Sequence, residues 1–491
     1  MMSFACAVLA FLPWAVSPEA EGVSSEQVMK WIDACEREID VLHGFVLLRH
    51  GKLVAEGSWA PYDTLNETHR LSSHSKCFIT TAAGFLVDEG KLDLDECVID
   101  ILPDKAPANP SRELVRLRVR DLLTMTLGAK AGNDETWRND RDGDWVKAIL
   151  ASPLDGNPGQ AFEYDSGATH ILGVIIERRA GRPLFEFLRE RLFRRIGIEK
   201  AWTTYDPMGQ ACAAWGFNMT TREISLIGQL YLDKGVWNGE RLLSEEWTTL
   251  ATTKQTHSGK SFKDRDPGND WLHGFGFNFW RCQHGCYRAD GSGGQYTIVF
   301  PEHEAVLSIN SDVWDMQQVL NIVWEHFLPA LAKDALPEDR AGAAALKARC
   351  KALAHKPVAG KREGADEFCG TYFPFKKSTN WLKGVRVDRK DGAWEVRLTT
   401  DAGEQAVPAA YGSWARSTVH YTKRTSEPLG ELIGPQRVAA SAAVQDDGSL
   451  KVTIHQLDGM RRIELRFCRK LFRKAVEGAV TGHTKLSTGL F

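Results

Sequence analysis

The sequence predicts an α+β domain followed by an all-β domain. The first 330 residues open with a helical segment and two strands, continue through amphipathic helices, and return to strands near residue 300. Strands at both ends of a helical stretch favour one sheet with helices packed against it. After residue 365, short alternating strands are separated by Gly and Asp turns, which is typical of a β-barrel or sandwich.

The boundaries follow from these changes in pattern. We expect an N-terminal segment over 1–23 and the α+β domain over 24–331. Apolar periodicity within that domain predicts its main elements in chain order: a helix at 24–41, two strands across 44–60, and helices at 74–90, 170–198 (broken at "AGRP"), 220–235 and 319–331. An Ala/Lys-rich linker with a helix is expected over 332–364, the all-β domain over 365–470, and a loosely ordered tail over 471–491.

Composition excludes some classes of partner. Sixty-one basic and 64 acidic side chains leave a net charge of −3, which gives no reason to expect nucleic acid or an acidic membrane surface as a partner. We expect a small-molecule or short-peptide substrate, and composition leaves the oligomeric state open. The ten cysteines are scattered, and the one close pair, Cys282 and Cys286, favours a hairpin turn over a metal site because no second ligand pair lies nearby.

The N-terminus carries an apolar run over residues 4–12, and no Lys or Arg precedes Lys30. A secretory signal needs a basic start, and a membrane span needs a longer run. We therefore expect no membrane span, and a buried strand or loop in a cytoplasmic protein. A degenerate signal, which would make the protein secreted or periplasmic, is the alternative.

The segment "SSHSKCF" places Ser73 and Lys76 at the start of an apolar helix. Residues i and i+3 of a helix share a face, so the amine can reach the hydroxyl. A desolvated lysine can remove the proton of a serine, and the N–H of Ser73 can then be one donor of an oxyanion hole. Ser72 and Ser75 are competitors, and Ser73 is preferred.

Two further segments add candidates. "YDSG" places Tyr164 and Ser166 ahead of a helix, where the phenol can act as a base and Ser166 can orient the lysine or a substrate carbonyl. "GSGGQ" puts Ser292, Gly293 and Gly294 directly before a strand. Glycine permits close approach of backbone to substrate, and the N–H of Gln295 would be the second oxyanion donor.

These three ordered elements, with the segments between them, resemble the serine β-lactamase and penicillin-binding-protein superfamily, on the side of class C β-lactamases, esterases and D-aminopeptidases. The resemblance covers about residues 20–330 and implies the β-lactamase/transpeptidase-like fold. It implies that Ser73 is acylated, that Lys76 and Tyr164 transfer protons, and that Ser73 and Gln295 N–H groups form the oxyanion hole. It implies neither a metal nor an organic cofactor.

Two departures from the family pattern affect the expected substrate. The cationic residue that begins the third element in β-lactamases is replaced by Ser292, and "YDS" replaces Tyr-x-Asn. Without a carboxylate anchor, unless Arg281 or Arg288 supplies one, an esterase, amidase or D-peptidase fits better than an antibiotic-destroying enzyme. The alternatives are an acyltransferase that uses the same acyl-enzyme and a catalytically idle, penicillin-binding-like homologue.

Overall fold

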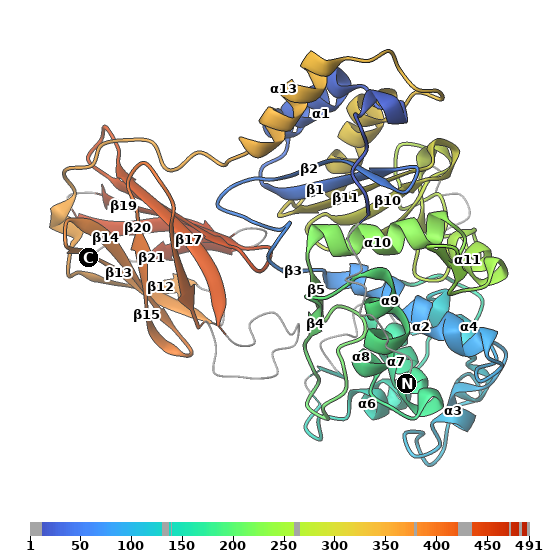
Figure 1. The fold of residues 1–491 in the computed structure, drawn as a ribbon. Helices are drawn as coiled ribbons and strands as arrows, with labels where there is room; N and C mark the ends of the chain where they lie inside the picture. Colours follow the sequence, from blue (N-terminus) through green and yellow to red (C-terminus); the bar gives the residue numbers. More distant parts are fainter. Residues whose placement is uncertain are drawn as a thin grey trace, which may run out of the picture.

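The structure, a computed structural model, describes residues 12–129, 137–138, 140–259, 266–377, 381–420, 435–470, 473–480 and 484–488. Two bodies are seen in Figure 1. The first contains a six-stranded sheet with helices around it, and the second is built on a ten-stranded sheet. The predicted order of an α+β part followed by an all-β part is confirmed.

The six-stranded sheet gathers strands from both ends of the first 330 residues. Its order is β2-β1-β11-β10-β9-β8, and neighbouring strands are antiparallel. The strands are β1 (Leu42–Arg49), β2 (Lys52–Ser58), β8 (Trp280–Arg281), β9 (Tyr287–Gly291), β10 (Gln295–Phe300) and β11 (Ala305–Ser311). β1, β10 and β11 are buried along their whole length, because helices cover both faces of the sheet.

Helix α10 (Thr221–Leu232) lies directly on one face of this sheet, against β1, β10 and β11. Close packing is possible because Gly228 lacks a Cβ, which would lie 2.5 Å from a Thr297 methyl carbon. The opposite face is covered by α1 (Ser25–Glu38), α12 (Met316–Ile322) and α13 (Arg340–Lys351). Each face therefore has its own apolar core.

A helical region extends beyond α10, as Figure 1 shows. Its helices are α2 (Lys76–Asp88), α3 (Val98–Ile101), α4 (Val119–Leu123), α6 (Trp145–Ala151), α7 (Ser166–Ala180), α8 (Leu184–Leu188), α9 (Arg194–Ile196) and α11 (Glu245–Thr252). The first body also contains two small sheets. One has the order β3-β5-β4, with β3 (His69–Arg70), β4 (Trp202–Thr203) and β5 (Phe217–Met219), and the other pairs β6 (Val236–Trp237) with β7 (Glu240–Arg241). The predicted break near 181 is the left-handed Gly181 at the end of α7.

The ten-stranded sheet of the second body closes on itself as a barrel. Its order is β15-β14-β13-β12-β21-β20-β19-β18-β17-β16, and Ala410, just after β15, exchanges backbone hydrogen bonds with Ala440 and Ala442 of β17. The strands are β12 (Tyr372–Lys377), β13 (Leu382–Lys390), β14 (Ala393–Thr400), β15 (Gly403–Ala409), β16 (Ala415–Val419), β17 (Gln436–Val444), β18 (Leu450–Gln456), β19 (Arg462–Lys470), β20 (Arg473–Val480) and β21 (Thr484–Thr488). Closure leaves a single apolar interior.

One expectation about this region was wrong. The residues after 470 were expected to form a loose tail, but β20 pairs with β19, and β21 joins β20 to β12. The two strands are required to complete the sheet, because without them β19 and β12 would be open edges. The Cys282–Cys286 segment is a hairpin turn between β8 and β9, as predicted.

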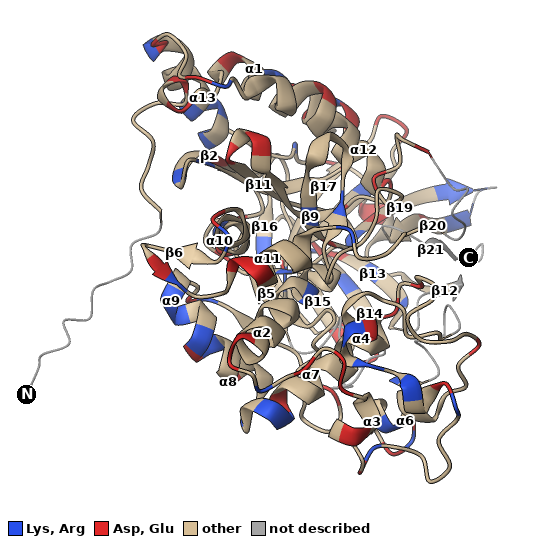
Figure 2. Cartoon of the chain, turned by 90° about the vertical axis from the view of Figure 1, so that its right-hand side faces the viewer, with Lys and Arg blue, Asp and Glu red and all other residues tan. Residues whose placement is uncertain are grey.

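The N-terminal apolar run falls almost wholly outside the described residues; where the description begins, Trp14 pairs with Leu53 of β2. No helix in the described ranges combines the length and apolar character needed to cross a bilayer. Figure 2 shows basic and acidic residues interspersed along the helices, as expected for a net charge of −3.

Candidate active site

Ser73 lies in a 3₁₀ turn, Ser72–Ser75, which leads directly into α2. In a 3₁₀ turn, residues i and i+3 eclipse one another, which brings position 76 over position 73 more closely than an α-helix does. The neighbours of Ser73 hold the turn in place. His74 Nε2 lies 2.8 Å from Thr297 Oγ1 on β10, and Ser75 Oγ accepts a hydrogen bond from the Phe217 N–H of β5.

Lys76 is the first residue of α2 and is only 1% exposed. Its Nζ donates to Ser73 Oγ at 3.1 Å, to Ser166 Oγ at 3.2 Å and to the Ala214 carbonyl at 3.0 Å. An ammonium group has three N–H bonds to donate, and these three acceptors lie around it. If the amine loses the proton that points at Ser73, the other two contacts still hold the nitrogen with its lone pair directed at that hydroxyl.

The two competing serines are turned to other partners. Ser72 Oγ lies 3.8 Å from Met460 Sδ, and Ser72 has a left-handed backbone with φ of 50°. Ser75 Oγ is used by the β5 backbone. Of the three serines of the turn, it is Ser73 that accepts a hydrogen bond from Lys76.

The segment Tyr164–Ser166 approaches Lys76 from α7. Asp165 is the N-cap of this helix, and its Oδ1 accepts the Gly167 N–H at 2.6 Å. This cap fixes the residues on both sides: Ser166 bonds to Lys76, and the ring of Tyr164 faces the Lys76 nitrogen at 4.9 Å from its centroid. Tyr164 is itself stacked on Trp280. A cation over an aromatic face is an attractive arrangement.

The Gly-rich turn joins β9 to β10 and lies against the Ser73 turn. Gly291 permits this approach, because a Cβ there would be 2.1 Å from the Leu71 carbonyl and 3.0 Å from the His74 N. The side chain of Gln295 is buried and donates to the Ser311 carbonyl at 2.7 Å, which fixes the position of its backbone. Ser311 Oγ donates to the carbonyls of Gly293 and Gly294, and Ser292 is exposed at the tip.

A buried ion pair lies next to this cluster. Asp290 on β9 accepts a hydrogen bond from Arg288 Nε at 3.0 Å, Arg288 Nη2 lies 2.9 Å from the same carboxylate oxygen as an ion pair, and both residues are buried. Burial raises the pKa of the Asp290 carboxyl, while Arg288 and, more weakly, Lys76 act to lower it. The carboxylate thus adds negative potential near the Lys76 ammonium. Arg288 and Asp290 are two residues apart on one strand, so their side chains lie on the same face. From this spacing the pair could have been predicted.

The two arginines considered as carboxylate anchors are engaged elsewhere. Arg288 is buried beneath Trp271 and bound to Asp290. Arg281 donates to the backbone carbonyls of Thr252 and Gly285, both at 3.0 Å. Both arginines are thus held by other groups, and Ser292, at the tip of the Gly-rich turn, is exposed.

Two contributors to the site have no signal in the sequence. The Ala214 carbonyl is a backbone group 138 residues from Lys76, so no side-chain pattern marks it. Met460 comes from the barrel, 388 residues from Ser72. Both reach the site only through the tertiary fold.

Known proteins resemble the first body of this chain. The family described as Beta-lactamase matches residues 36–321, more than half of the 491. The 6-aminohexanoate-dimer hydrolase of Paenarthrobacter ureafaciens is 30% identical over an alignment of 227 residues, and the match covers 41% of this chain and 55% of that protein. The chain spans about half the length of the curated relatives that it matches first.

Two solved structures share the fold. A penicillin-binding protein homolog from Caulobacter crescentus has a TM-score of 0.51 at 16% identity, covering 63% of this chain and 99% of that one. EstCE1, titled a hydrolase with promiscuous acyltransferase activity, has a TM-score of 0.50 at 19% identity, covering 62% and 99%. With the family match and the ordered motifs around Ser73, these likenesses lead to one conclusion: the chain belongs to the β-lactamase family.

Proposed function

We propose that the protein is a serine hydrolase that cleaves an ester or amide of a small molecule or short peptide through an acyl-enzyme on Ser73. The observation that carries this proposal is the buried Lys76 amine, 3.1 Å from a half-buried serine hydroxyl and held by two further acceptors. A surface lysine would have no reason to be fixed in this way. The hydrolase named among the relatives supports the reaction class.

The first half-reaction forms the acyl-enzyme. The Ser73 proton passes to the proton-transfer pair of Lys76 and Tyr164, and Oγ attacks the substrate carbonyl carbon. The electron pair of the C=O bond moves to oxygen, and the N–H groups of Ser73 and Gln295 stabilise that oxyanion. When the carbonyl re-forms, the bond to the alcohol or amine breaks and the leaving group takes the proton. Lys76 and Tyr164 titrate as a coupled pair in this proposal.

The second half-reaction decides between hydrolysis and acyl transfer. Water attacks the acyl-enzyme and releases the acid, or an added alcohol or amine attacks and takes the acyl group. The same proton-transfer pair serves both routes. Measuring the ratio of acid to transferred product as an acceptor alcohol is added separates them, and a product pool that stays pure acid identifies a hydrolase.

The engagement of Arg281 and Arg288 and the exposed Ser292 bear on the substrate. Neither arginine is left to hold a carboxylate beside the scissile bond. We therefore expect turnover of p-nitrophenyl acetate and negligible hydrolysis of nitrocefin, which carries such a carboxylate. Rapid nitrocefin turnover would show that another cation holds it.

A fluorophosphonate probe followed by mass spectrometry of the labelled peptide tests the nucleophile. We expect labelling at Ser73 that is lost in Ser73→Ala and retained in Ser72→Ala. Each variant removes one serine hydroxyl, and the two serines are adjacent in the chain. The Ser72 hydroxyl makes a long contact of 3.8 Å with the sulfur of Met460. An unlabelled, folded wild-type protein would instead identify an idle homologue.

A further inference from the structure

A loop of the C-terminal barrel lies on the Ser73 turn. Residues 457–461 connect β18 to β19, and their backbone meets β3, just before the turn: the Arg70 N–H donates to the Asp458 carbonyl at 2.9 Å. His69 Nε2 lies 3.1 Å from the Gly459 carbonyl. The loop therefore extends the backbone network that positions the nucleophile, although it belongs to the other body.

Met460 brings this loop to both sides of the site. Its Sδ lies 3.8 Å from Ser72 Oγ, next to Ser73 in the chain. A Cβ on Gly293 would lie only 2.5 Å from the same sulfur, so the thioether rests on the Gly-rich turn and requires glycine there. The Met460 side chain thus spans the distance between the nucleophile segment and the turn that precedes Gln295.

The loop is held by charged groups at its base. Asp458 accepts hydrogen bonds from the N–H and Nε of Arg437 on β17, both at 2.5 Å. Arg437 also donates to the Thr68 carbonyl at 2.9 Å and pairs with Glu67 at 2.9 Å, and both of these residues precede β3. One arginine therefore ties the loop to the first body.

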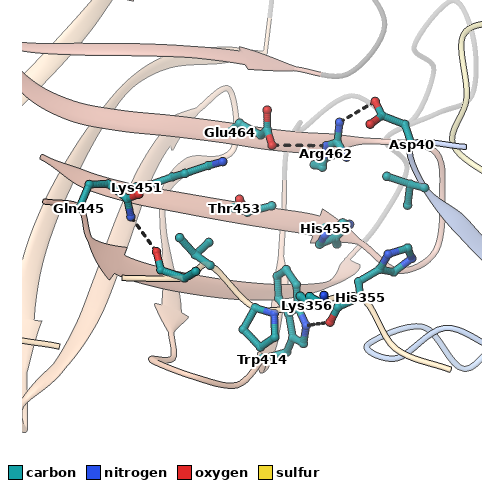
Figure 3. A pocket seen from close by; sticks show the side chains of 14 residues that line it. Asp40, His355, Lys356, Trp414, Gln445, Lys451, Thr453, His455, Arg462 and Glu464 are labelled. Atoms are coloured by element: carbon teal, nitrogen blue, oxygen red, sulfur yellow. Dashed lines mark hydrogen bonds and ion pairs between the residues drawn. The ribbon is translucent and has the colours of Figure 1, made fainter. Parts of the chain in front are cut away.

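The two strands that carry the loop are anchored as well. They line a pocket of about 310 Å³ between the bodies, shown in Figure 3. On β18, His455 Nδ1 lies 2.8 Å from Tyr62 Oη, and on β19, Arg462 pairs with Asp40 at 3.0 Å. Both supports of the loop are thereby fixed to the first body, so the position of Met460 is set by several independent contacts.

From these contacts we propose that the 457–461 loop is a wall of the substrate site and that Met460 determines specificity by limiting the size of the group next to the scissile bond. This inference rests on the proposed acyl-enzyme at Ser73. A half-buried thioether beside the nucleophile favours compact, uncharged substrates and restricts bulky ones. It assigns the barrel a part in substrate selection.

The test compares Met460→Ala with Met460→Leu in two ester series. One series varies the acyl group on p-nitrophenol from acetate to butyrate and benzoate, and the other varies the alcohol of an acetate ester. For Met460→Ala we expect kcat/KM for the bulky member relative to the small one to rise about tenfold or more in at least one series. One methylene in a pocket already changes discrimination by about tenfold, and this variant removes a methylene, the sulfur and a methyl group. Met460→Leu keeps the volume and should keep the wild-type ratio.

The outcomes separate the two proposals. If the wild type hydrolyses p-nitrophenyl acetate and is labelled at Ser73, but Met460→Ala changes neither ratio by more than about twofold, the wall is excluded while the hydrolase stands. If the wild type is neither active nor labelled, both proposals fall. Met208→Ala, at an exposed methionine, is the control for general effects and should leave both ratios unchanged.

Discussion

Two buried polar clusters in this protein differ in the charge that they can hold. Around Lys76, two side-chain hydroxyls and a backbone carbonyl accept from one amine. At the boundary between the bodies, His43 stacks on Tyr62 and its Nδ1 lies 2.8 Å from His69 Nε2. The first cluster supplies three acceptors for a cation. In the second, the Arg70 and Gly459 carbonyls beside His69 do not outweigh the effect of burial on its pKa.

This difference shows two ways in which a protein offsets the free-energy cost of burying a titratable side chain. Burial lowers the pKa of His69 to about 4 and that of His43 well below its ordinary value, so both rings are neutral at pH 7. Lys76 is as deeply buried, but its three acceptors and the nearby Asp290 provide for an ammonium. A site that must exchange a proton needs partners for both of its protonation states, whereas a structural cluster needs partners for one.

Replacing the lysine without changing its length tests the first cluster most strongly. Lys76→Met keeps the stem and removes the amine, and we expect kcat/KM for p-nitrophenyl acetate to fall by about 10³ or more, because general acid–base catalysis contributes about 10²–10⁴. Lys91→Met, at an exposed lysine just after α2, is the matched control and should retain activity. A Lys76→Met protein that is folded and near wild-type activity would remove the lysine from the mechanism.

Acid should break the second cluster. The folded pKa of His69, about 4, lies below the ordinary value of 6.5, so the unfolded chain binds more protons in this range. The contribution of the neutral His69 ring to the free energy of unfolding is fully present above about pH 6.5 and is lost as the pH falls towards 4. For this one group, the loss between pH 7 and pH 5 is roughly 2 kcal/mol.

Urea unfolding at a series of pH values measures this effect. We expect the free energy of unfolding to fall between pH 7 and 5 in the wild type, and to fall less steeply in His69→Gln. His326→Gln, at a partly exposed histidine in the helical segment Val323–Phe327 that follows α12, should keep the wild-type slope. Equal slopes in all three proteins would contradict the assignment to the boundary cluster.

Removing one acceptor from the lysine sharpens the comparison further. Ser166→Ala leaves Lys76 with Ser73 and the Ala214 carbonyl, so we expect the nitrogen to stay near the nucleophile and kcat/KM to fall only about tenfold, the equivalent of one hydrogen bond. Ser152→Ala removes a hydroxyl that bonds to the Ala148 carbonyl within α6, and should have no effect on activity. A loss as large as that of Lys76→Met would give Ser166 a direct chemical role.

The smallest effect is expected from the hydrogen bond between the bodies. Tyr62→Phe removes the contact with His455 at 2.8 Å and should lower the free energy of unfolding by about 1 kcal/mol. Tyr205→Phe, at a tyrosine that is about half exposed, serves as the control in the same urea measurement. No loss of stability in Tyr62→Phe would mean that water replaces the phenol.

Much of the fold could be predicted because the spacing of apolar residues along the chain indicates which face of a helix or strand is buried. The helix leading from Lys76, the capped helix after Thr220 and the strand after the Gly-rich turn all occur where apolar spacing and capping residues indicate. The strands after residue 470 were missed, because β20 places its apolar residues in two adjacent Ala-Val pairs rather than in strict alternation, and β21 has a single apolar residue. Tertiary pairing makes them strands, because β20 hydrogen-bonds to the edge of β19 and β21 to the edge of β12.

The sequence by itself determined the local chemistry: a serine three residues before a lysine, a tyrosine beside a helix cap, and glycines before a strand. These are properties of residues close together in the chain. They can be predicted because a helix repeats every 3.6 residues and a strand every 2, which fixes which neighbours share a face. Only the tertiary structure decided which carbonyl holds the amine and that Met460 lies beside Ser72. Such contacts join segments that are 138 and 388 residues apart, and no local pattern encodes them, because they depend on how whole sheets and helices pack.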